Sequence, residues 1–383
     1  KLSDILCIFY VLGFLGSMFS FLQFLASPVV GGLSDVYGRK PIMLICLVGI
    51  ASSYVLWALS KNFALFVLAR VVGGISKGNV PILLRYMYPA TADDTNPLLT
   101  YAALVGIAFS VGFIIGPVIG AMFARWSHGQ SGDWFVVPAL FALALSVLDI
   151  LFVLIVFKET LAQEALGEKR AKSLAGSLSQ AKAYINLPDI FRFRAVKNLP
   201  KSDLKELQRL GFIYFIYLFL YSGLEFTLTF LTHHTFNYTS MQQGWMFFVI
   251  GLTMALMQGS YVRRLPEHKI KHTAVLGLLL IVPAFICVGL ASSPILLYIG
   301  LLLFAISTAM VVPCMMTLVS KLGSHDQKGT VMGIFRSLGA LARAVGPIIA
   351  SIAFWSVGST VTYLVGGFAL FLPWIMLKKS KIA

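Results

Sequence analysis

Residues 31–41 read GGLSDVYGRKP and lie between two long apolar stretches, residues 9–30 and 42–60. The segment carries Asp35, Arg39 and Lys40 between glycines, in a chain with few charges elsewhere. A helix of about 20 apolar residues is long enough to cross the hydrocarbon core of a bilayer. The stretch therefore predicts a polar turn that joins two membrane-spanning helices.

The composition of the whole chain extends this prediction. Hydrophobic residues make up 58% of the sequence and charged residues only 12%, whereas soluble domains have about 25% charged residues. Polar breaks divide the chain into about eleven apolar segments of spanning length. Strand-like alternation is absent, so we expect an all-α polytopic membrane protein.

The positive residues behind the formal net charge of +15 are distributed unevenly between the polar breaks. Most Lys and Arg residues lie in every second polar break, above all in the longest break, residues 158–209. This asymmetry is the positive-inside rule, and it predicts that these breaks face the cytosol. The basicity therefore indicates topology and not nucleic-acid binding, and anionic lipid headgroups are the expected neighbours.

An internal repeat divides the chain into two halves. GFIIGPVIGA (112–121) matches ARAVGPIIAS (342–351), and GSYVRRLPEHK (259–269) is a weaker match to the opening stretch at nearly the same offset. We expect one bundle in residues 1–160, a cytosolic linker in 161–207 and a second bundle in 208–383. If the halves are equivalent, the first lacks one helix, which should precede Lys1.

The linker allows two interpretations. Its second part mixes apolar and basic residues, which favours short interfacial helices broken at Pro188 and Pro200. A solvated basic linker is the alternative.

The opening stretch resembles the cytosolic loop signature of the major facilitator superfamily. The matching residues are Gly31, Leu33, Asp35, Gly38, Arg39 and Lys40. GFIIGPVIG resembles the fifth-helix motif of that superfamily, and Arg70 with Gly74 resembles its fourth-helix motif. In KETL (158–161), Lys158 departs from the proline of the related drug-transporter motif. The resemblance covers the whole chain as helices two to twelve of twelve. Further stretches resemble the animal tetracycline-transporter-like branch, which is associated with organic-anion transport.

The resemblance implies that the loop is a gate between the two bundles. In physical terms, Gly31 and Gly38 can let another backbone pass closely or can turn the chain with a positive φ, and Asp35 can accept hydrogen bonds from a helix N-terminus. Arg39 and Lys40 can anchor in cytosolic headgroups. A plain turn with positive-inside charges is the alternative interpretation.

Six ionisable residues fall inside apolar segments, where each costs about 2.5–3.5 kcal/mol to insert. They are Arg70, Lys77, Asp149, Glu225, Arg336 and Arg343. The excess of cations favours an anionic ligand, since the Arg fork suits carboxylates.

Roles can be assigned to five of these six residues. We expect Arg70, Lys77 and Arg343 to bind the anion. Glu225 or Asp149 would carry a proton, and Glu225 is favoured because the resemblance places the seventh helix at the central cavity. Structural ion pairs between helices are the alternative for each.

We expect Arg336 and a set of glycines to belong to the parts of the protein that move during transport. Arg336 lies nearer the cytosolic end and is expected to belong either to the gate or to an ion pair. Gly112, Gly116 and Gly120 form a ridge that suits close helix contact, and Pro117 would bend that helix. Gly346 and Pro347 are the equivalents in the second half.

The combined interpretation is a secondary active transporter of organic anions that works by alternating access and couples to protons. One alternative is a proton-driven exporter of cationic or amphiphilic drugs such as tetracycline, with Asp149 and Glu225 as cation ligands. Another is a transport-inactive receptor or scaffold. We expect no enzymatic activity, no cofactor and no metal, because no phosphate-binding loop or zinc-binding His pair occurs. We further expect a monomer in the plasma membrane, with an endomembrane or the nuclear envelope as alternatives.

Overall fold

The computed structural model describes four parts of the chain: residues 2–77, 106–157, 187–322 and 328–380, without positions 109, 113, 117, 121, 124–125, 127–135, 195 and 197–198. These residues form helices and no strand, as the composition predicts. Within them, eight helices are long and apolar enough to cross a membrane. The spans are Arg39–Ala58, Val136–Val156, Lys201–Phe236, Ser240–Arg264, Glu267–Gly289, Pro294–Ser320, Val331–Val357 and Ser359–Lys378.

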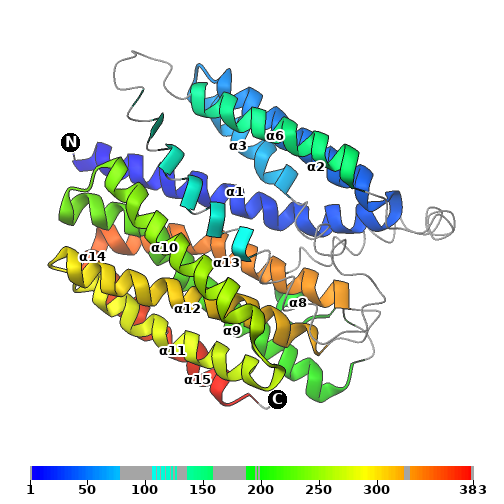
Figure 1. The fold of residues 1–383 in the computed structure, drawn as a ribbon, viewed down its shortest axis with the longest axis vertical. Coiled ribbons are helices and arrows are strands. Elements are labelled where there is room, and N and C mark those ends of the chain that lie inside the picture. The colour runs from blue at the N-terminus through cyan, green and yellow to red at the C-terminus, as the bar shows by residue number, and fades with distance from the viewer. Residues whose placement is uncertain are drawn as a thin grey trace.

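The first half of the chain contributes four named helices. They are α1 (Leu2–Tyr37), α2 (Arg39–Ala58), α3 (Phe63–Ser76) and α6 (Val136–Val156). The described positions between 106 and 126 are helical as well. Helix α2 packs against α3 and α6, and α1 packs against α3 (Figure 1).

The turn between α1 and α2 is shorter than the sequence suggests. Gly38 separates the helices with φ at 103°, a conformation that glycine adopts at little cost. Gly31 and Asp35 lie within α1, which continues to Tyr37. Of the two possibilities for these glycines, a positive φ is present at Gly38, whereas Gly31 lies within α1 and does not turn the chain.

The second half is a larger helical bundle. Its elements are α8 (Leu187–Phe191), α9 (Lys201–Phe236), α10 (Ser240–Ser260), η2 (Val262–Arg264), η3 (Glu267–Lys269), α11 (Ile270–Gly289), α12 (Pro294–Ser320), α13 (Lys328–Val357), α14 (Ser359–Ala369) and α15 (Phe371–Lys378). Helix α11 packs against α12 and α14, and α9 packs against α13. Most of the buried hydrophobic core lies in this bundle.

The end of the linker is folded onto this bundle. Residues 161–186 lie outside the described part of the chain, but α8 contacts α9 and α13. Phe193, with φ at 50°, is fully buried, and its ring occupies the space beside Gly211. Helix α9 begins at Lys201, directly after Pro200. A short helix before Pro200 is thus present, and α9 extends to the N-terminal side of position 208.

The two halves meet along two pairs of helices. Helix α1 lies along α13 (Figure 1). On the other side, α10 approaches the helical stretch of residues 106–120 at Gly251, where a Cβ atom would lie 2.9 Å from the Ser110 carbonyl oxygen. Ser110 Oγ also donates a hydrogen bond of 3.1 Å to Gln258 Oε1, and both side chains are buried.

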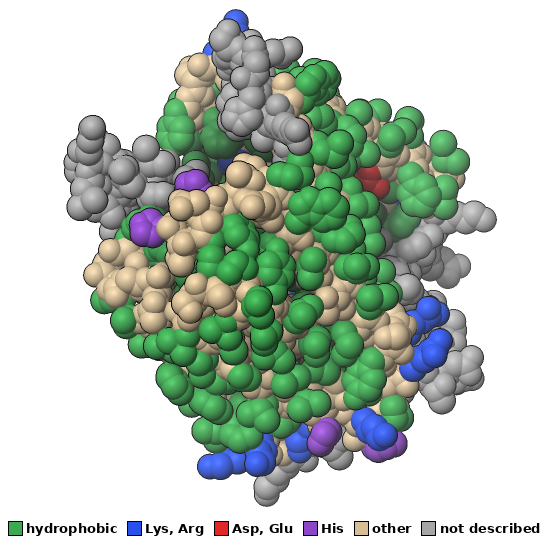
Figure 2. Space-filling view, turned by 60° about the vertical axis from the view of Figure 1, so that its left-hand side comes forward, with side chains coloured by type: hydrophobic (Ala, Val, Ile, Leu, Met, Phe, Trp, Pro, Cys, Tyr) green, Lys and Arg blue, Asp and Glu red, His purple; other side chains and the backbone are tan. Residues whose placement is uncertain are grey.

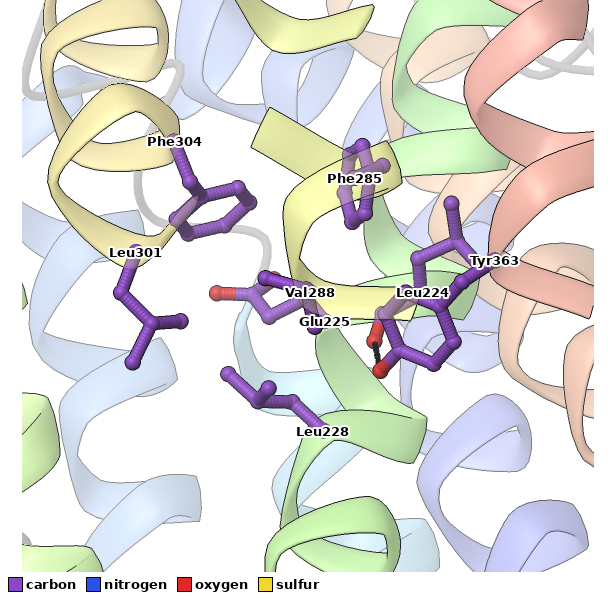
Figure 3. Close-up of a pocket in the computed structure, with 8 residues that line it drawn as sticks. All are labelled: Leu224, Glu225, Leu228, Phe285, Val288, Leu301, Phe304 and Tyr363. Atoms are coloured by element: carbon purple, nitrogen blue, oxygen red, sulfur yellow. Dashed lines mark hydrogen bonds between the residues drawn. The ribbon is translucent and has the colours of Figure 1, made fainter. Parts of the chain in front are cut away.

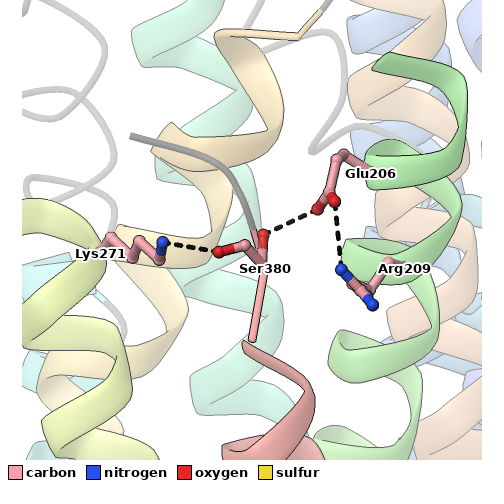
Figure 4. A network of polar contacts seen from close by, with 4 residues as sticks. All are labelled: Glu206, Arg209, Lys271 and Ser380. Atoms are coloured by element: carbon pink, nitrogen blue, oxygen red, sulfur yellow. Dashed lines mark hydrogen bonds and ion pairs between the residues drawn. The ribbon is translucent and has the colours of Figure 1, made fainter. Parts of the chain in front are cut away.

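The surface is that of a membrane protein, with a broad apolar face and with Lys and Arg residues at its edge (Figure 2). Figure 2 shows a broad hydrophobic face with Lys and Arg side chains gathered along its lower edge. A network of polar contacts lies in the second bundle around Ser380 (Figure 4). Ser380 Oγ donates a hydrogen bond of 2.7 Å to Glu206 Oε2, and Lys271 Nζ donates one of 2.8 Å to the Ser380 carbonyl oxygen. Glu206 also pairs with Arg209 at 3.1 Å. This network ties the last residues described to α9 and α11.

Candidate functional site

Two cations of α3 lie against one aromatic ring. The guanidinium carbon of Arg70 is 4.9 Å from the centre of the Phe19 ring, and Lys77 Nζ is 5.5 Å from the same centre. Arg70 is half-buried and Lys77, which caps the C-terminus of α3, is exposed. Their spacing of seven residues places both side chains on the face of α3 that meets α1.

Arg343 brings a third positive charge to the same region. It projects from α13 with an exposed side chain, and its charge and that of Arg70 both act on Lys77. No ion pair joins these three cations to a carboxylate in the part of the chain that the structure describes. The three residues predicted to bind an anion therefore form one cluster of positive charges from α3 and α13 that makes no ion pair among the described residues.

Glu225 lies in electrostatic reach of this cluster. The charge of Arg343 acts on its carboxyl group, and Tyr221, one turn earlier in α9, donates a hydrogen bond of 3.0 Å to Glu225 Oε1. Tyr221 in turn stacks on Phe304 of α12, with ring centres 5.1 Å apart. The Tyr221 hydroxyl thus orients the Glu225 carboxylate, and aromatic side chains lie beside it.

A small pocket borders Glu225 (Figure 3). Besides the carboxylate, apolar and aromatic side chains line it: Leu224, Leu228, Phe285, Val288, Leu301, Phe304 and Tyr363. The Tyr363 hydroxyl donates a hydrogen bond of 2.7 Å to the Leu224 carbonyl oxygen and accepts one of 3.2 Å from Thr227 Oγ1. Two hydroxyl contacts therefore fasten α14 to α9 beside the carboxylate.

Asp149 lies apart from this cluster. It is an exposed residue of α6, a helix that packs against α2. Its surroundings on α6 are exposed apolar side chains such as Leu148 and Phe152. The structure therefore does not bring the two intramembrane acids together.

The predicted gate residues are described in part. Lys40 Nζ donates a hydrogen bond of 2.9 Å to the Leu154 carbonyl oxygen, which links the start of α2 to the end of α6. The side chain of Asp35 lies outside the described residues. Arg336 is half-buried on α13, and the positive charge of Arg343, seven residues later on the same helix, acts on it. Arg336 thus lies near the cation cluster.

The glycine motifs of the two halves are packed differently. A Cβ atom at Gly346 would lie 2.5 Å from the Phe219 carbonyl oxygen, so α13 and α9 touch there through their backbones. Among the residues that the structure describes, none lies within 4 Å of a Cβ atom built at Gly112, Gly116 or Gly120. The helix interface expected at these three glycines stays a prediction. Pro347 is buried inside α13, whereas Pro117 lies outside the described residues.

A comparison of the sequence with family profiles decides to which family the chain belongs. The profile described as Major Facilitator Superfamily matches residues 9–347. The chain belongs to the major facilitator superfamily. Members of this superfamily are transporters and not enzymes, and this chain is therefore a multi-pass membrane transporter.

Individual relatives narrow the comparison within the superfamily. Major facilitator superfamily domain-containing protein 10 of Homo sapiens is 44% identical over 373 residues, which are 96% of this chain and 78% of the human protein. A solved structure described as "Crystal structure of the human organic anion transporter MFSD10 (TETRAN)" superposes with a TM-score of 0.83 at 43% identity, covering 95% of this chain and 83% of that one. The class H tetracycline resistance protein of Pasteurella multocida is 32% identical over 158 residues, 41% of this chain and 37% of that protein.

Sequence reasoning missed the aromatic part of this transporter's site. Phe19 and Tyr221 sit in apolar stretches rich in other aromatic residues, so nothing in their local sequence separates them from packing residues. One signal was available for Phe19. The pair Gly73-Gly74 between Arg70 and Lys77 indicates that another helix approaches α3 there.

Proposed function

We propose that this transporter moves organic anions by secondary active transport. The observation that carries the proposal is the cluster of Arg70, Lys77 and Arg343, which makes no ion pair among the described residues. Like charges inside apolar segments raise the free energy of the empty protein, and binding of an anion offsets that cost. The human relative of known structure is described as an organic anion transporter, which supports the same substrate class.

Glu225 is the group we propose for proton coupling. A carboxyl group can bind or release a proton, and its charge then acts on Arg343, which belongs to the anion cluster. Protonation of Glu225 would therefore change how strongly Arg343 attracts an anion. Asp149 is exposed on a peripheral helix, and we assign it no part in coupling.

Alternating access would use the two contacts between the halves. These are α1 with α13 and α10 with the stretch of residues 106–120. We propose that the turn at Gly38, with Arg39, Lys40 and Arg336, contributes to the cytosolic gate. The transporter would act as a monomer in the plasma membrane.

Replacement of Lys77 tests the anion site. The full-length protein is reconstituted in liposomes, and initial uptake of a labelled organic carboxylate is measured. Lys77→Gln should reduce uptake about 10-fold or more, because a charge-assisted contact contributes roughly 1.5–3 kcal/mol. The matched control is Lys61→Gln, since Lys61 is exposed in the turn before α3 and should leave uptake unchanged. Normal uptake by Lys77→Gln at equal protein content would refute the assigned site.

Export of cationic drugs is the second candidate, favoured by the likeness to tetracycline resistance proteins. It requires acids as ligands, and of the two intramembrane acids only Glu225 lies near the cluster. Transport of a cationic amphiphile that is lost in Glu225→Gln and kept in Lys77→Gln would support this candidate over the anion transporter.

A further inference from the structure

The Phe19 ring is shared by two cations that repel each other. Arg70 and Lys77 lie about two helical turns apart on α3, and both lie close to the ring, at 4.9 and 5.5 Å from its centre. Aromatic rings attract cations within about 6 Å of the centroid. The ring therefore offers both residues an attractive contact where their own interaction is unfavourable.

The backbone of α3 fixes this arrangement. A Cβ atom at Gly74 would lie 3.1 Å from the Phe19 carbonyl oxygen, and one at Gly73 would lie 3.5 Å from Phe19 Cε2. The missing side chain at Gly74 lets the backbone of α1 approach α3 between the two cations, and the Phe19 ring lies at ordinary contact distance from Gly73. The packing of α1 on α3 thus places Phe19 beside both cations.

An aromatic partner differs from a carboxylate in one decisive way. A carboxylate would hold Arg70 or Lys77 in place but would also cancel its charge. A ring holds the cation through its quadrupole and carries no net charge, so the full positive charge stays available to a ligand. This is the property that an empty anion site requires.

We propose that Phe19 is a positioning residue of the anion site, which holds Arg70 and Lys77 ready for the anion without neutralising them. This inference rests on the proposed anion transport. It predicts that removal of the ring weakens anion binding and leaves the later transport steps intact.

The experiment compares side chains at position 19 in full-length protein reconstituted in liposomes. Phe19→Leu should raise the KM for a labelled organic carboxylate about 5- to 30-fold, while kcat changes by less than about 2-fold. Phe19→Tyr and Phe19→Trp keep a ring and should retain the wild-type KM. The matched control is Phe21→Leu on the same helix, because Phe21 is exposed and its ring pairs with Phe24. Equal protein content and elution profiles check that the variants fold.

Three results would overturn the inference. They are a wild-type KM in Phe19→Leu, an equal rise in Phe21→Leu, and a Phe19→Tyr protein as impaired as Phe19→Leu. The last two would mean that packing of α1 and not the ring matters. Failure of the proposed function looks different, since the wild-type protein itself would then take up no carboxylate.

Discussion

Glu225 accepts a hydrogen bond from Tyr221, and the charge of Arg343 acts on its carboxyl group. Asp149, by contrast, is an exposed residue of α6. The sequence identified both acids because charge inside an apolar segment is rare and costly. It could not separate their environments, because these depend on which helix faces which. The ring of Phe19 was not recognisable for the same reason, since cation–π contacts join residues from different helices.

The two acids give a paired prediction at this scale. Glu225→Gln cannot take up a proton, so carboxylate uptake should no longer respond to an inward proton gradient, while exchange of labelled for unlabelled substrate continues. Asp149→Asn should respond to the gradient as the wild-type protein does. Uptake is measured with and without the gradient in liposomes. A gradient response retained in Glu225→Gln but lost in Asp149→Asn would reverse the assignment.

At the scale of helices, equivalent positions of the repeat have different surroundings. Gly346 touches the backbone of α9, whereas Gly116, its equivalent, has open space beside it among the described residues. The repeat predicted the equivalence from sequence, but packing also depends on the neighbouring helix. Likewise, the glycine at each end of residues 31–38 suggested a long turn, yet helical hydrogen bonding continues to Tyr37 and only Gly38 turns the chain.

This difference predicts unequal tolerance of a methyl group. Gly346→Ala places a Cβ atom 2.5 Å from the Phe219 carbonyl oxygen, so α13 must move away from α9 at a cost of about 1–3 kcal/mol. Gly116→Ala adds the same atom where no described residue lies within 4 Å, and should leave stability unchanged or raise it by up to about 1 kcal/mol because Ala favours the helix over Gly. Thermal unfolding of both variants in detergent measures the difference. Equal melting temperatures would contradict the tight contact between α13 and α9.

At the scale of the molecule, two features of composition predicted most of the architecture. Long apolar segments specify membrane-spanning helices, and the distribution of Lys and Arg specifies their orientation. Neither feature determines how the two halves meet. That depends on close contacts such as Gly251 against Ser110, which become recognisable only when α10 lies beside residues 106–120. The cation cluster of Arg70, Lys77 and Arg343 is likewise a property of the assembled halves.

The central claim is that this cluster selects anions, and substrate charge tests it most directly. Uptake of a labelled organic carboxylate and of an amine of the same carbon skeleton is measured in proteoliposomes under an inward proton gradient, with protein-free vesicles as the blank. We predict that the carboxylate accumulates above the blank and that the amine does not. Transport of the amine without the carboxylate would contradict the claim, because a site dominated by three cations repels a cationic substrate.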